Sequence, residues 1–217
     1  MHTKVFTCNT INMAVFIVFS ICFGGCGMVL NKPALKITNY VLEYDPPVIN
    51  AEKPVLPVHL TIGRFASAPE YRAKKMIYKD EANVMNNYNY HSWAAYPSDM
   101  VGYFLLRDFA RSGLFKAVID FTNINISPTY FIDGTLEEFY EKDEADIRMA
   151  VVSVDITIGY DKETDVTKKI VFQRNYKAET PYAENTLKSL AAAMSKSVEN
   201  ISKRIIEDTY TILAADF

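Results

Sequence analysis

The chain has 217 residues, with 23 basic and 26 acidic side chains and a net charge of −3 when histidine is counted as neutral. This mildly acidic balance excludes the electrostatic attraction to nucleic acid, or to an anionic lipid surface, that a strongly basic protein has. All three cysteines, Cys8, Cys22 and Cys26, lie within the first 26 residues. The remainder of the chain can therefore form no disulfide.

The N-terminus has the pattern of an export signal. After a weakly basic start, an apolar run extends from Met13 to Phe23, and Gly24-Gly25 precede Cys26. Such a run is too short, and wrongly flanked, for a membrane-spanning helix. The segment from Phe23 to Cys26 resembles the lipobox of bacterial lipoproteins, in which the cysteine thiol receives a diacylglycerol, although Phe23 stands where leucine is usual. An ordinary signal peptide or a buried helix would not explain why cysteines are confined to this region.

We therefore predict a signal peptide over residues 1–25, a lipidated tether over 26–35 and one domain over 36–217. Acyl chains on Cys26 would hold the protein at a membrane, because each buried methylene contributes about 0.8 kcal/mol. Gly27 follows the cysteine. An aspartate at this position would resemble an inner-membrane retention signal, and the chain has none there. The outer membrane is the expected destination.

Alternating and helical hydrophobic patterns then predict the elements of the domain. In chain order, we expect strands at 36–44, 58–65, 75–78 and 88–93, a helix at 98–112, strands at 116–121, 130–140, 149–160 and 168–176, and a long helix at 184–213. An Asn-rich turn is expected at 83–87 and a polar turn at 161–167. For the first helix, Ser98 is the expected N-cap and Gly113 the left-handed residue that ends it.

This order of elements predicts an α/β fold. The period of two in 149–160 indicates a sheet with one buried face, and both helices have an apolar stripe that could cover it. We expect a single domain in which a mixed β-sheet is covered by two main helices, as a two-layer or three-layer sandwich.

The sequence contains none of the usual catalytic or metal-binding motifs. His59 and His91 lie on different predicted elements, and neither has a second ligand at metal-binding spacing. There is no phosphate-binding glycine loop and no nucleophile elbow. The acidic residues between 137 and 146 lack the spacing of a calcium loop, so we expect a solvated hairpin tip there. Together these absences favour a non-enzymatic protein without metal or cofactor.

An aromatic segment over 86–96 has more than one interpretation. It could be a platform that stacks on sugars, or a rim that buries aromatic rings against a partner protein. It could also be an ordinary strand that presents Tyr88 and Tyr90 on one face. We favour a core position for Trp93, whereas partner contact stays open for Tyr88 and Tyr90.

Several short segments resemble one protein family. They are Tyr40-Val41-Leu42-Glu43-Tyr44, Arg64-Phe65, Ile77-Tyr78, Trp93 before the first helix, Ser112-Gly113-Leu114-Phe115 at its exit, and Gly134 within a strand. This series is similar to that of the ABC-type transport auxiliary lipoproteins, the family of paraquat-inducible protein C. The resemblance covers most of residues 36–213 and includes the lipobox.

The resemblance implies a periplasmic α/β domain tethered to the outer membrane. Such a protein would be a non-enzymatic accessory of a transporter that also has an ABC ATPase, a permease and a mammalian-cell-entry (MCE) substrate-binding protein, and that moves lipids or other hydrophobic molecules. Some relatives form rings, so a homo-oligomeric ring is one implied assembly. The alternative is that the domain itself carries a lipid in an apolar pocket between the long helix and the sheet.

Overall fold

The computed structural model describes residues 36–49, 52–81, 84–122, 128–144 and 147–217. The predicted signal peptide, the tether and Cys26 lie outside the described residues. Among the helices within these ranges, none combines the length and the apolar character needed to cross a membrane.

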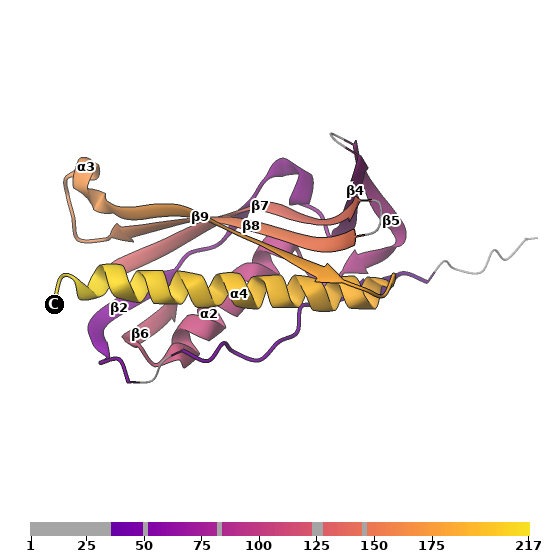
Figure 1. Cartoon of the computed structure of the whole chain (residues 1–217). Helices are drawn as coiled ribbons and strands as arrows, with labels where there is room; N and C mark the ends of the chain where they lie inside the picture. Colours follow the sequence, from indigo (N-terminus) through magenta and orange to yellow (C-terminus); the bar gives the residue numbers. More distant parts are fainter. Residues whose placement is uncertain (1–35, 50–51, 82–83, 123–127, 145–146) are drawn as a thin grey trace, which may run out of the picture. The chain divides into compact units, whose positions relative to one another are not determined.

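A long central strand, β7 (Tyr130–Glu144), organises the mixed sheet (Figure 1). One edge of β7 pairs along its whole length with antiparallel β8 (Ile147–Tyr160), which in turn pairs with β9 (Ile170–Tyr182). The other edge of β7 is shared by three parallel strands in succession: β2 (Leu56–Ile62), β3 (Ala66–Ser67) and β4 (Lys75–Glu81). The sheet therefore divides into two branches along this second edge of β7.

Each branch is completed by further strands. β6 (Phe115–Asp120) pairs in parallel with β2. β5 (Val84–Trp93) is antiparallel to β4, and β1 (Thr38–Tyr40) lies parallel to β5. A short 3₁₀ helix, η1 (Pro69–Tyr71), connects β3 towards β4. The expected α/β fold with a mixed sheet and two main helices is confirmed.

The two main helices cover the same face of the curled sheet, which gives two layers. α4 (Leu187–Ala214) runs along β8 and β9, and α2 (Pro97–Ser112) packs beside it against β6 and β7. The predicted alternation in β8 holds only in part, because Val151 and Ser153 on the opposite face are buried as well. On the face that was predicted to be buried, five side chains are at most 1% exposed. These are Ala150, Val152, Val154, Ile156 and Ile158.

Helix α2 begins one residue earlier than predicted. Pro97 is its first residue and Tyr96 the N-cap, so the expectation of a Ser98 cap was wrong. Proline is favoured at the first helical position because its missing amide hydrogen would have no partner there. The helix ends as predicted at Gly113, whose φ of 69° lies in the left-handed region.

Other boundaries differ from the sequence predictions. The expected turn at 83–87 is too long, because Asn86 and Asn87 lie in β5 and pair with Tyr78 and Ile77. The polar connection after β8 includes one helical turn, α3 (Val166–Lys169), and β9 then continues to Tyr182. Polar residues in these strands occupy exposed positions, where hydrophobicity gives no signal.

The predicted strand at 36–44 is regular only at β1. After it, residues 41–49 form a strap that is held by polar contacts: the Tyr44 hydroxyl donates to Asp108 Oδ2 at 2.8 Å, and Ser202 of α4 donates to the same oxygen at 2.7 Å. Arg107 donates to Asp108 Oδ1 and to the Tyr44 carbonyl. The buried Asp108 carboxylate thus joins the strap to both helices, and burial together with this carboxylate raises the pKa of Tyr44.

Candidate functional site

The Phe65 ring fixes the position of helix α2 on the sheet. It packs between two glycines, Gly102 of α2 and Gly134 of β7. An ideal Cβ on Gly134 would lie 2.5 Å from Cδ1 of the ring and closer still to Cε1, so only glycine leaves room for it. The Arg-Phe segment and the strand glycine, which are far apart in the sequence, are therefore two sides of one contact.

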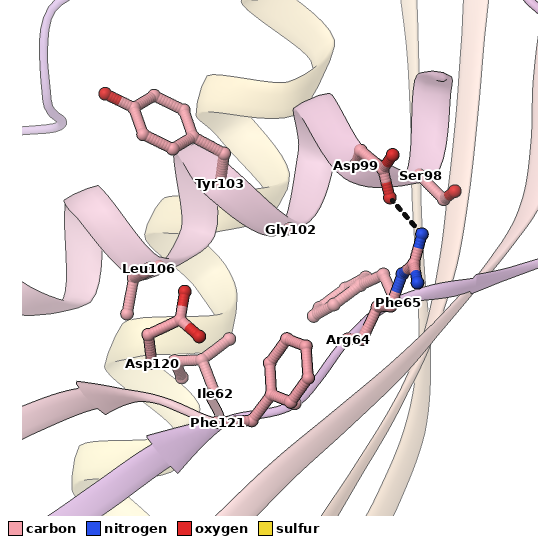
Figure 2. Close-up of a pocket in the computed structure, with 11 residues that line it drawn as sticks. Ile62, Arg64, Phe65, Ser98, Asp99, Gly102, Tyr103, Leu106, Asp120 and Phe121 are labelled. Atoms are coloured by element: carbon pink, nitrogen blue, oxygen red, sulfur yellow. Dashed lines mark ion pairs between the residues drawn. The ribbon is translucent and has the colours of Figure 1, made fainter. Parts of the chain in front are cut away.

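An open groove lies beside this contact, between the N-terminal half of α2 and the ends of β2 and β6 (Figure 2). Its volume is about 310 Å³. The lining residues are Ile62, Gly63, Arg64, Phe65, Ser98, Asp99, Gly102, Tyr103, Leu106, Asp120 and Phe121. The volume is at the lower end of the roughly 300–1,000 Å³ typical of ligand pockets.

Two large aromatic side chains flank the groove and are open to solvent. Tyr103 is 62% exposed and Phe121 is 45% exposed, whereas Phe65 is buried. Exposed aromatic residues beside a concave apolar surface are typical of contacts with a partner, because they bury much area with little loss of side-chain freedom. The groove therefore has the composition of a docking site.

Charged groups lie at both ends of the groove. The Arg64 guanidinium is 3.7 Å from an Asp99 carboxylate oxygen, with side chains 72% and 40% exposed. At this distance and exposure the pair contributes about 0–1 kcal/mol, so it does not lock the groove shut. Asp120 Oδ1 accepts a hydrogen bond from the Thr122 amide at 2.8 Å. The lining includes no histidine, cysteine or lysine, and among the described residues no group of acidic, histidine or cysteine side chains could hold a metal ion.

Comparison with known families decides the identity. The sequence profile of the ABC-type transport auxiliary lipoprotein component matches residues 40–206. The chain belongs to this family. The resemblance expected from the sequence is thereby confirmed. Comparison with curated proteins gives no significant match.

Solved structures share the fold of this auxiliary lipoprotein. A protein from Xanthomonas campestris has a TM-score of 0.73 and 16% identity, over 82% of this chain and 98% of that one. A hypothetical protein from Chlamydia trachomatis has a TM-score of 0.51 and 8% identity, over 74% of this chain and 99% of that one. At such low identity these likenesses establish the fold alone.

The aromatic segment of the auxiliary lipoprotein lies apart from the groove lining. Trp93 is buried, as expected, with its ring centroid 5.2 Å from that of Phe139. Tyr88 is half-buried and its hydroxyl donates to Glu141 Oε2 at 2.6 Å, whereas Tyr90 is 48% exposed. Of the two candidate contact residues, Tyr90 therefore offers the more accessible ring.

Glu141 corrects the expectation of a solvated acidic hairpin tip. The strand β7 continues to Glu144, and Glu141 is only 2% exposed. The hydroxyls of Tyr88 and Tyr182 both donate to its carboxylate, and Arg148 Nε is 3.7 Å away. Burial, reinforced by the hydrogen bond to Glu141, raises the pKa of both tyrosines. The acidic run gave no sign of this, because Phe139, Tyr140 and Glu141 are buried in succession, which departs from the simple alternation expected of a strand with one buried face.

Sequence reasoning also missed Tyr103 and Phe121. One usable signal was present: Tyr103 is a large aromatic residue outside the apolar stripe of its helix. Phe121 follows a strand that already ends at Asp120. Only the packing of α2 against the ends of β2 and β6 brings these two rings to one groove.

Proposed function

We propose that the protein is a lipid-anchored, non-enzymatic accessory of an ABC transporter of the MCE type, which moves lipids or other hydrophobic molecules across the envelope. Cys26 would carry the anchor, and the folded domain would stand at the periplasmic face of the outer membrane. The observation that carries this proposal is the family match over residues 40–206. The partners would be the MCE-domain protein and the permease and ATPase.

The anchoring part of the proposal rests on the domain organisation predicted from the sequence. Residues 1–25 would be removed as the signal peptide, and residues 26–35 would form the tether. At about 3.3–3.6 Å per residue, an extended tether of this length reaches roughly 35 Å. The domain would thus be free to turn its groove towards a partner while staying close to the membrane.

A Cys26→Ser variant tests the anchor. It should lack acyl chains and leave the membrane fraction, because the thiol is the atom that receives the lipid. Cys8→Ser is the matched control, since Cys8 lies in the segment that would be removed, and it should remain anchored. A Cys26→Ser protein that is still membrane-bound and unprocessed would mean that the apolar N-terminus is an uncleaved anchor.

Photo-crosslinking tests the partner part of the proposal. A crosslinker placed at Tyr103 or Tyr90, both exposed, should capture the MCE-domain protein or the permease in envelope extracts. The control position is Val48, which is 88% exposed and lies outside the groove. Capture equal to that at Val48 from both tyrosine positions would count against the adaptor role. A ring of identical copies is part of the same proposal, and native mass spectrometry of the detergent-solubilised protein would reveal it.

The second candidate function is direct binding of a lipid or other hydrophobic ligand. The groove supports it through the apolar side chains of Ile62, Phe65 and Leu106. The core between α4 and the sheet supports it less, because Leu190, Met194 and Val198 are at most 1% exposed there. Native mass spectrometry of gently purified protein should show a bound lipid if this alternative is correct, and an empty protein would refute it.

A further inference from the structure

We infer that a partner protein docks an extended segment along the free edge of β6 and places one apolar side chain, flanked by a lysine or arginine, in the groove. This inference rests on the proposed function, because it specifies the segment by which a protein of the transport system would be held. It is carried by three observations: an unpaired strand edge, the limited size of the groove and an excess of negative charge in the groove lining.

The first observation is the strand edge. β6 is the terminal strand of its branch and, within the described part of the chain, pairs only with β2. Ala117, Val118 and Ile119 in its middle are half-buried, so part of each stays accessible. An unpaired edge presents backbone donors and acceptors that a further strand can use. Because Asp120 and Phe121 at the end of β6 line the groove, a strand added here would lead directly into it.

The other two terminal strands are less suited to this pairing. β1 has only three residues. On β9, the backbone carbonyl of Lys177 already accepts a hydrogen bond from Arg204 of α4 at 2.9 Å, and the Lys177 side chain forms ion pairs with Glu138 and Glu179. Charged side chains protect an edge strand from pairing with another chain. β6 has a single charged residue, Lys116, before its terminal Asp120.

The second observation is the size of the groove. A groove volume of about 310 Å³, with the Phe65 ring, Leu106 and Phe121 in its lining, suits one large side chain (Figure 2). An aromatic or aliphatic anchor that fills a pocket rimmed by further contacts is the usual arrangement of a binding hot spot. A groove this small and open favours a single side chain as its occupant over a lipid with two acyl chains.

The third observation is the charge. Two carboxylates, Asp99 and Asp120, and one guanidinium, Arg64, line the groove. Figure 2 shows the Asp120 carboxylate directed towards the groove, whereas Arg64 extends to Asp99 at the opposite end. The resulting negative charge near Phe121 favours a cationic residue beside the apolar anchor and disfavours an anionic lipid headgroup.

Peptide binding to the full chain in detergent micelles tests the inference. The probe is a fluorescein-labelled peptide, Lys-Phe-Thr-Val-Thr, and the readout is fluorescence anisotropy. Exchanging its lysine for glutamate should weaken binding by about tenfold, which corresponds to about 1.4 kcal/mol. Serine in place of its phenylalanine should abolish binding, and methylation of alternate backbone amides should weaken it, because each removes one part of the proposed contact.

Variants of the protein locate the site. Phe121→Ser should weaken binding of the probe by about tenfold or more, as expected for an anchor contact. Tyr103→Ser should act in the same direction and should leave the fold intact, because the side chain is 62% exposed. Asp120→Asn should reduce the preference for lysine over glutamate, whereas the control Val48→Ser should change nothing.

The inference is overturned if the lysine and glutamate peptides bind equally, or if neither groove variant weakens binding. It is also overturned if a fluorescent phosphatidylglycerol binds in a Phe121-dependent manner and displaces the peptide, because the groove is then a lipid site. The proposed function fails separately. Capture of the MCE-domain protein without any peptide binding rejects only the groove, and peptide binding without capture of any transport component rejects the accessory role.

Discussion

Replacing Gly134 by alanine is expected to destabilise the domain by about 2 kcal/mol. The new methyl group would lie 2.5 Å or less from three ring atoms of Phe65, whereas carbon atoms in contact are normally about 3.5–4.0 Å apart. The ring cannot simply withdraw, because Gly102 of α2 is on its other side, where a Cβ would already be 3.2 Å away. Overpacking costs about 1–3 kcal/mol, and an overlap this close belongs at the upper end of that range. A strand gains roughly 0.5–1 kcal/mol when glycine becomes alanine, which leaves a net loss of about 2 kcal/mol.

The assay is urea denaturation followed by the fluorescence of Trp93, the single tryptophan, which is buried against Phe139. With a slope of about 1–3 kcal/mol per molar urea, a loss of 2 kcal/mol lowers the midpoint by roughly 1 M. The same substitution is then made in a Phe65→Ala background, which is itself destabilised by about 3–5 kcal/mol. Without the ring, Gly134→Ala should be neutral or slightly stabilising.

The interaction energy between the Gly134→Ala and Phe65→Ala substitutions shows whether the two residues are in contact. Residues in direct contact show interaction energies of about 0.5–3 kcal/mol, whereas independent sites add to within about 0.5 kcal/mol. If Gly134→Ala costs the same with and without the Phe65 ring, the glycine is not required by this contact and the assigned packing of Phe65 against Gly134 is wrong.

Three further predictions concern the remainder of the domain. Asp108→Ala should cost about 3 kcal/mol of unfolding free energy in the same assay, because it removes the carboxylate that balances the charge of the nearly buried Arg107. Gly113→Ala should cost about 1 kcal/mol, since alanine is disfavoured at a φ of 69°; no change would argue against the left-handed helix end. The raised folded-state pKa values of Tyr88 and Tyr182 contribute stability that is complete below the unfolded value of 10.0 and is lost as the pH rises above it. Tyrosinate absorbance should therefore show these two ionising later than in a Glu141→Gln variant, and identical titrations would contradict the assigned hydrogen bonds.

Much of the fold was accessible from sequence pattern because each element buries a regular set of side chains. The period of two in β8 and the helical stripe of α4 identified the largest parts of the core. The sequence predictions were wrong where burial does not follow the hydrophobic pattern of a regular element. Residues 41–49 bury Leu42 and Ile49 without forming a strand, and the buried Glu141 sits in a run of acids that looked solvated.

The candidate groove was not predictable to the same degree. Arg64, Phe65 and Gly134 stood out as short family segments, yet their spacing in the chain does not show that a ring from one rests on the other. Tyr103 and Phe121 lie on separate elements that meet only after β2, β6 and α2 are packed. A groove is a property of that packing, so no single segment contains its signal.

The sequence by itself determined the class of the protein. Its N-terminal pattern and confined cysteines predict an export signal and Cys26 as the lipid site, and its short segments are those of the transport auxiliary family. Only the tertiary structure decided which residues of the domain line the groove. Local sequence patterns indicate which residues prefer burial. The packing of Phe65 against Gly102 and Gly134, by contrast, depends on contacts between distant parts of the chain. The same is true of the position of the Asp120 carboxylate in the groove.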